Sequence, residues 1–114
     1  MKNGINKVTL VGHVGENPKV NETKENGLVV HVSLATNESY KDKDGKEQKK
    51  TEWHRIVAWD KRAEIIRDYV KKGDPLYVEG KLNTSSYDDK AGIKRYTTDV
   101  FCENFLFLSP KNSE

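Results

Sequence analysis

The sequence predicts an all-β domain, a five-stranded Greek-key barrel with one helix between strands 3 and 4. Apolar and polar residues alternate along five segments of the chain, which is the period of half-buried strands. One amphipathic stretch lies between the third and fourth segments and has helical spacing. Of the 114 residues, 34% are apolar and 33% are charged, a balance typical of one strand-rich domain with a solvated face.

The first two strands are separated by a long polar loop. Apolar side chains alternate over residues 5–14 and again over residues 28–37, so each segment has one face for the core. Gly15 and Pro18 end the first strand, because both residue types interrupt a regular ladder. Residues 16–27 are expected to form a loop with room for one short strand.

The third strand and the helix follow each other closely. Residues 51–59 are predicted as the strand, and Asp60 is expected to cap the N-terminus of a helix over residues 61–72. Gly73 and Pro75 are then expected to end the helix, because neither residue continues it.

Two long strands complete the barrel. They are expected over residues 76–87 and 93–108, joined by a turn at residues 88–92. Three strands, one helix and two strands in this order favour the OB-fold, a partly open five-stranded barrel. We expect this domain to occupy residues 1–109, followed by a short polar tail over residues 110–114.

The composition excludes several classes of protein. The longest apolar runs are only four residues, at positions 56–59 and 105–108, which is too short for a membrane span or a signal peptide. The single cysteine, Cys102, excludes an internal disulfide and fits a reducing, cytoplasmic setting. A net charge of +2 and a pI near 8.6 permit an anionic partner without requiring one.

No pattern typical of an enzyme is present. His13, His31 and His54 are scattered and lack the spacing of metal ligands. No Gly-Lys-Ser/Thr follows the glycines at positions 12–15, so the segment is not a phosphate loop. Cys102 is expected to be a small buried residue on a strand. We therefore predict no catalytic residue, no metal and no cofactor.

The third strand carries the most informative side chains. Alternation places Trp53, Arg55 and Trp59 on one face and His54 on the other. Aromatic rings beside a cation suit a single nucleic-acid strand, because bases stack on the rings and cations neutralise phosphates. A duplex hides its base faces, so exposed rings select single strands. Tyr40 and Tyr87, near the ends of neighbouring strands, are further candidates for stacking.

A competing interpretation places both tryptophans in the core. Tryptophan side chains are mostly buried in folded proteins, and a strand of a small barrel needs one apolar face to pack against the core. Arg55 argues against it, because an unpaired charge between two buried rings would be costly.

The segment from 41 to 50 is rich in charge. The turn signal Asp44-Gly45 predicts a hairpin-like excursion over residues 40–51, and five lysines and three acids surround the turn. Mixed-charge loops are common, so a solvated flexible loop is the favoured interpretation. The alternative is a mobile arm that closes over nucleic acid.

These segments together resemble the bacterial-type single-stranded DNA-binding proteins. Each marker is weak alone, but their order over residues 4–108 is specific. The markers are Asn6-Lys7-Val8, Leu10-Val11-Gly12, Leu34-Ala35-Thr36, Thr51-Glu52-Trp53-His54-Arg55, Lys72-Gly73, Tyr77-Val78-Glu79-Gly80 and Arg95-Tyr96-Thr97-Thr98.

The resemblance implies an OB-fold homotetramer that binds single-stranded DNA without catalysis in the bacterial cytoplasm, associated with the nucleoid. By position, it implies base stacking on Trp53, Trp59, Tyr40 and Tyr87. It implies backbone contacts by Arg55, Lys61, Lys72 and the lysines of the long loop, including Lys43 and Lys49. We add Lys7 and Lys81 to the expected DNA contacts, and Lys81 shares its strand face with Tyr87. The expected subunit interface includes His54, Lys7, Val8 and Tyr77.

Two features depart from the family pattern. A basic cluster that many relatives carry before the fourth-strand aromatic is replaced here by Asn83, Ser85 and Ser86. Many relatives also continue to an acidic C-terminal tip that docks partners, whereas this sequence stops at Glu114. Docking through such a tip is therefore not expected.

Two functions follow as alternatives. The first is sequence-independent binding of single-stranded DNA, which protects unwound strands during replication, repair and recombination. The second is an OB-fold interaction module for primosome or repair assembly, with DNA binding secondary. An RNA ligand also stays open, because base stacking does not depend on a 2′-hydroxyl.

Overall fold

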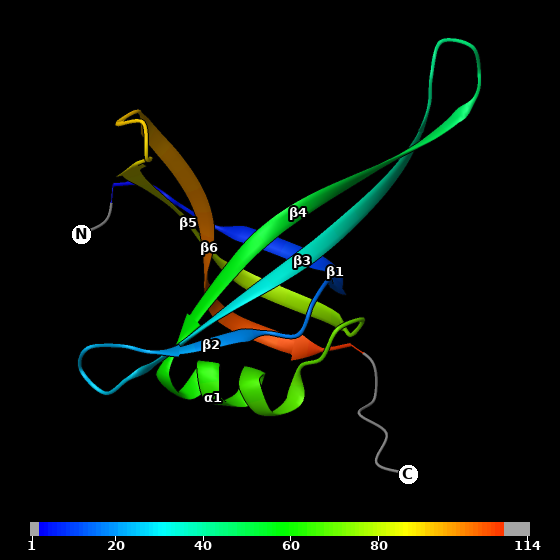
Figure 1. The fold of residues 1–114 in the computed structure, drawn as a ribbon. Coiled ribbons are helices and arrows are strands. Elements are labelled where there is room, and N and C mark those ends of the chain that lie inside the picture. Colours follow the sequence, from blue (N-terminus) through cyan, green and yellow to red (C-terminus); the bar gives the residue numbers. More distant parts are fainter. Residues whose placement is uncertain (1–2, 109–114) are drawn as a thin grey trace.

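The computed structural model describes residues 3–108, and the predicted tail at 110–114 lies outside this range. The described chain forms six strands and one helix (Figure 1). In chain order they are β1 Val8–Val14, β2 Lys19–Glu22, β3 Leu28–Lys41, β4 Glu47–Trp59, α1 Asp60–Tyr69, β5 Pro75–Asp88 and β6 Lys94–Phe107.

Five of the strands close into a barrel. The sheet order is β1-β5-β6-β4-β3-β2, and β1 also pairs with β3. That second pairing joins His13 to Ala35 and Val14 to Leu34, so the sheet has no open end within the barrel. β4 and β6 run parallel, whereas the other pairs are antiparallel. This is the predicted OB-fold, and β2 is the short strand for which the polar loop had room.

The barrel closes only because β1 passes very near β3. A Cβ atom on Gly12 would lie 2.2 Å from the carbonyl oxygen of Ala35. A side chain here would therefore strike backbone, which cannot move without opening the barrel. The interior is filled by alternate apolar residues of the strands, and its largest fully buried side chains include Leu34, Ile56 and Leu76.

Helix α1 packs beneath one end of the barrel, where Ala63 and Ile66 enter the core (Figure 1). The prediction of Asp60 as N-cap was wrong: the helix begins at Asp60, and its N-cap Trp59 makes no side-chain capping bond. The Asp60 carboxylate faces the backbone N–H of Leu28 instead, with Oδ1 3.4 Å from the nitrogen. The helix ends at Tyr69, three residues earlier than predicted.

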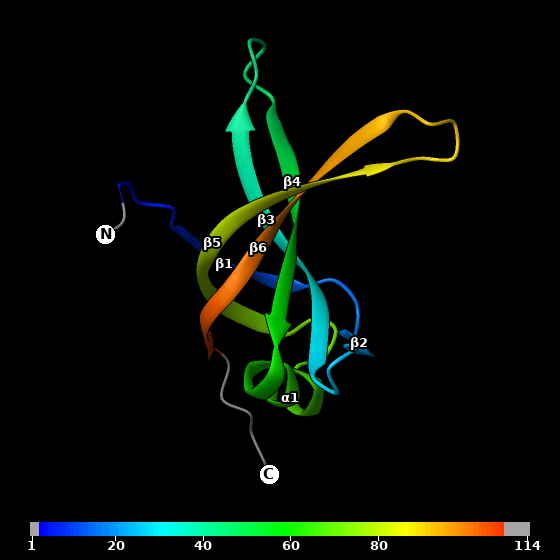
Figure 2. The ribbon, with the colours of Figure 1, turned by 90° about the vertical axis from the view of Figure 1, so that its left-hand side faces the viewer.

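Two hairpin arms project beyond the barrel, one from β3 and β4 and one from β5 and β6 (Figures 1 and 2). The hairpin predicted around Asp44-Gly45 is confirmed, whereas the favoured interpretation of 41–50 as a loop is right only for residues 42–46, because paired strands reach Lys41 and Glu47. The tips share one construction. Asp42 accepts the N–H groups of residues 44 and 46, and Asp89 accepts those of residues 91 and 93. Each carboxylate also accepts a side-chain donor, from Gln48 and Arg95 respectively.

Candidate nucleic-acid interface

An aromatic and basic surface lies on the outward side of β4. Trp53 is 60% exposed and Trp59 is 37% exposed, and Arg55 between them is also exposed. His54 points the other way, and its Nε2 lies 2.9 Å from the Thr36 hydroxyl. The prediction that both indoles are accessible on the side away from His54 is confirmed, and the core interpretation of the tryptophans is wrong.

Register shows which residues share this side of the sheet. Direct partners in neighbouring strands point to the same face. Val29, His31, Ser33 and Ala35 of β3 stand opposite Trp59, Val57, Arg55 and Trp53 of β4. Phe101 of β6 stands beside Val57, which places Asp99 beside Arg55. We call this surface the tryptophan face, defined by Trp53, Arg55, Trp59, His31, Ser33, Asp99 and Phe101.

The two tryptophans are presented differently. Trp59 meets Phe101 edge to face, with ring centroids 4.6 Å apart and planes at 86°. This geometry is favourable for aromatic pairs and holds the Trp59 ring against the sheet. Trp53 has no such aromatic partner among the described residues and is the more exposed ring. Both can accept a base, since each retains free ring surface.

The charge of Arg55 is balanced by a buried acid. Its Nε lies 3.3 Å from Oδ1 of Asp99, which is only 9% exposed. Burial and the positive charge of Arg55 lower the pKa of nearby His31, while Asp99 acts in the opposite direction. His31 is therefore neutral at pH 7. Arg55 and His31 also line a hollow of about 420 Å³ beside the loop that joins β1 to β2.

The tyrosines lie on the arms. Tyr87 pairs with Arg95, on the continuation of the tryptophan face along β5 and β6. Tyr40 pairs with Gln48, and alternation puts it on the side of the β3–β4 ribbon opposite Trp53. Both tyrosines are 53% exposed. The structure thus brings Tyr87, but not Tyr40, onto the same sheet side as the tryptophans.

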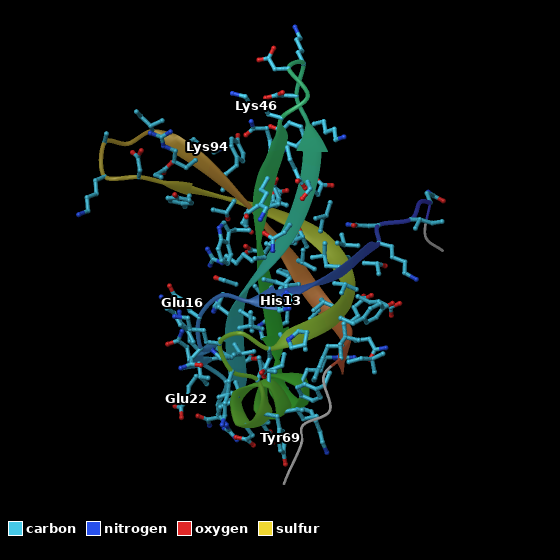
Figure 3. All side chains as sticks on the ribbon, turned by 90° about the vertical axis from the view of Figure 1, so that its right-hand side faces the viewer. His13, Glu16, Glu22, Lys46, Tyr69 and Lys94 are labelled. Atoms are coloured by element: carbon cyan, nitrogen blue, oxygen red, sulfur yellow. The ribbon has the colours of Figure 1, made fainter. Side chains whose placement is uncertain are left out.

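The predicted lysines are spread over the molecule. Lys49 alternates with Trp53 on the β3–β4 arm, and Lys43 lies in its turn. Lys46 and Lys94 extend near the two arm tips (Figure 3). Lys61 lies in the first turn of α1.

The remaining predicted lysines lie away from the arms. The backbone N–H of Lys72, just after α1, donates to Asn17. Lys81 stands directly opposite Phe101 across β5 and β6, which puts it on the side of the tryptophan face, and it also lines a hollow with the segment 3–6. Lys7 faces Glu79 at 4.0 Å and is not brought to the tryptophan face.

The residues predicted at a subunit interface are not gathered in one place. The Tyr77 hydroxyl donates to Glu79 at 2.6 Å, and this bond raises the pKa of Tyr77 and lowers the pKa of Glu79. Lys7 joins them, while Val8 packs partly against the chain's own core. His54 lies on another strand pair, against Thr36. Their interface role stays a prediction.

Sequence reasoning missed several parts of the face. Along their own strands, His31 and Phe101 alternate onto the face that points outward. This alternation could have identified both residues from the sequence. Asp99 could not be connected to Arg55 without the parallel pairing of β4 and β6. Cys102 is buried as predicted, and burial raises the pKa of its thiol to about 11.

Metal binding and membrane insertion are two further functions on which the described residues bear. Across residues 3–108, no group of three or more His, Cys, Asp or Glu side chains is placed to hold a metal ion. Within that same range, no helix has the length and apolar character needed to cross a membrane.

The fold and this face define an OB-fold protein with a surface suited to nucleic acid, and comparisons with known proteins agree. The family model of the Single-strand binding protein family matches residues 5–108, so the chain belongs to this family. It is 48% identical over 114 residues to Single-stranded DNA-binding protein 1 of Chlorobaculum tepidum, covering 99% of this chain and 70% of that protein.

Solved structures show the same fold. The Plasmodium falciparum SSB in complex with ssDNA superposes with a TM-score of 0.87 at 30% identity, covering 96% of this chain and 99% of the other. A deletion mutant of the single-stranded DNA binding protein from Thermus aquaticus gives a TM-score of 0.81 at 25% identity, covering 95% of this chain and 52% of the other.

Proposed function

We propose that this protein binds single-stranded DNA without sequence specificity, through stacking on exposed aromatic rings and neutralisation of phosphates. The observation that carries the proposal is the presence of two accessible indoles on one side of β4, with Arg55 between them. Family membership supports it, because the Plasmodium falciparum SSB, which is 30% identical to this chain, has been solved in complex with ssDNA.

The physics of the face favours single strands of any sequence. Every base has a flat π-surface, so stacking on Trp53, Trp59 and Tyr87 does not depend on base identity. The lysines of the arms and of α1 carry the charge that neutralises phosphates and releases their counterions. The two arms leave the barrel in different directions, which extends the path available to a strand (Figures 1 and 2).

This activity fits the handling of unwound strands in the cytoplasm during replication, repair and recombination. A protein that stacks bases holds a strand extended and blocks reannealing. The single cysteine, Cys102, is buried and forms no internal disulfide, the bond that would favour an oxidising compartment.

We further propose that the protein works as a homotetramer. Val11, Tyr77 and Leu106 are direct neighbours across β1, β5 and β6, and Val11 and Leu106 are more than half exposed. An apolar strip of this kind on a chain with a small core fits contact with another copy. The whole length of Val8–Gly12 pairs with β5 on one side only, which leaves a strand edge for a second subunit.

The test is a titration of intrinsic tryptophan fluorescence with oligo(dT), oligo(rU) and duplex DNA of matched length. We expect quenching by oligo(dT) at micromolar protein or below, and weak quenching by the duplex. Preference for oligo(rU) would replace DNA by RNA as the ligand. Absence of quenching by all three would favour the interaction-module alternative.

A further inference from the structure

The end of strand β1 meets the ring of Trp53. Gly15 directly follows β1, and its N–H donates to the carbonyl oxygen of Ser33 at 2.9 Å. A Cβ atom on Gly15 would lie 2.4 Å from Cζ3 and 2.8 Å from Cη2 of Trp53. The outer edge of the six-membered ring therefore occupies the space that a side chain at this position would need.

Two glycines near the end of β1 thus have different neighbours. At Gly12 the missing side chain would meet the backbone of Ala35, so that glycine is required by the barrel itself. At Gly15 all three of the nearest atoms belong to the Trp53 ring. Ordinary van der Waals contact begins at 3.4 Å, so even a methyl group would have to displace this ring by about 1 Å or rotate it.

We propose that Gly15 is a positioning residue for DNA binding, because its lack of a side chain lets the Trp53 indole rest against the end of β1. This inference rests on the proposed function. Trp53 is 60% exposed, and the backbone at Gly15 is itself held to β3, so the end of β1 offers the ring a fixed surface. A ring held in place before DNA arrives loses less side-chain freedom on binding than a mobile one.

The consequence is a separation of folding from binding. A methyl group at position 15 pushes an exposed ring into solvent, which the barrel tolerates. It removes the stacking platform from its position, which DNA binding does not tolerate. Gly15 carries no charge, so the number of phosphates neutralised is unaffected.

The experiment compares Gly15→Ala with Gly4→Ala. Gly4 is the matched control, because a Cβ there meets nothing within 4 Å and its backbone is not left-handed. We expect Gly15→Ala to keep the parental melting temperature and to weaken oligo(dT) binding about tenfold, within the factor of about 5 to 150 for one stacked base. The slope of log K against log salt stays unchanged, and Gly4→Ala binds like the parent.

A double-mutant cycle isolates the ring contact. In a Trp53→Ala background, Gly15→Ala is expected to have no further effect on affinity, because no ring is left to displace. A Trp59→Phe background leaves Trp53 as the only indole, and there Gly15→Ala is expected to shift its emission towards that of free tryptophan in water.

Several results would overturn the inference. Parental affinity for Gly15→Ala, an equal loss in the Trp53→Ala background, or a large fall in melting temperature would each show that Gly15 does not act by seating this ring. Failure of the proposed function is distinguishable, since the parent would then not bind oligo(dT), or Trp53→Ala would bind as tightly as the parent.

Discussion

We expect the free energy of DNA binding to come partly from base stacking and partly from phosphate neutralisation. Comparing the oligo(dT) affinity and its salt dependence in Trp53→Ala and in Lys61→Ala separates the two contributions. Removing Trp53 deletes one stacking platform but no cation. Oligo(dT) affinity should fall by about 1–3 kcal/mol per site, the value for one stacked base. Lys61→Ala removes one cation and should reduce the slope of log K against log salt by about 0.7 if it meets one phosphate.

The structure limits how far Trp53→Ala can act through folding. The residue is 60% exposed, so two fifths of its surface is buried in the free protein. For a side chain of roughly 200 Å², this is about 80 Å², or about 2 kcal/mol of folding stability. A domain of ordinary stability stays folded after such a loss.

Arg55 should contribute less to the salt dependence of binding than Lys61 and more than Trp53. Its guanidinium is already paired with Asp99 at 3.3 Å, so its positive charge is partly neutralised before DNA binds. We expect Arg55→Ala to weaken binding but to change the salt slope by less than Lys61→Ala does. Asp99→Asn releases the Arg55 charge and should steepen the slope, whereas Asp68→Asn, which breaks the exposed pair with Arg67 on α1, serves as the matched control.

The assay is fluorescence anisotropy of a labelled oligo(dT) of one length, over about 50 to 200 mM salt. Subunit association of every variant is checked first. The argument is refuted if Trp53→Ala lowers the salt slope as much as Lys61→Ala, or if it leaves the affinity unchanged.

Three further predictions follow from other parts of the molecule. Gly12→Ala should cost more than about 2 kcal/mol in urea unfolding, because its Cβ would lie 2.2 Å from the Ala35 carbonyl oxygen, and a loss below ~1 kcal/mol would contradict the account of barrel closure. The lowered pKa of His31 favours its neutral form in the fold, so stability should fall as the pH drops below its ordinary value of 6.5. Urea titrations above and below that pH test this, and an equal fall in His31→Gln would assign the effect elsewhere. Light scattering at micromolar concentration should give a mass several times 13.0 kDa, and particles of monomer mass alone would rule out the tetramer.

Local pattern was enough to predict the faces of the strands. Alternation with a period of two separates Trp53, Arg55 and Trp59 from His54. The structure agrees, because the regular pairing of β4 with β3 keeps these side chains on opposite faces of the strand. The order of strands and the place of the helix were also predictable, since each element has its own composition and boundaries.

Local pattern failed where two signals competed. The turn signal at 44–45 correctly predicted a hairpin, but the charges around it indicated a loop over residues 41–50, whereas the cross-strand ladder continues to Lys41 and Glu47. Asp60 is a residue type that commonly caps helices, but its carboxylate turns to the backbone N–H of Leu28 at the start of β3. In both places a contact with a distant segment outweighed the local preference.

The sequence by itself determined that two indoles and a guanidinium share one face of one strand. That this face points outward was decided by the tertiary structure, which leaves both indoles exposed. Only the tertiary structure decided what surrounds them: Asp99 beside Arg55, Phe101 against Trp59 and Gly15 beneath the edge of Trp53. The physical reason is that alternation is a property of one strand, whereas these contacts depend on the register between strands. That register is set by closure of the whole barrel, through the parallel pairing of β4 with β6 and the close approach of β1 to β3.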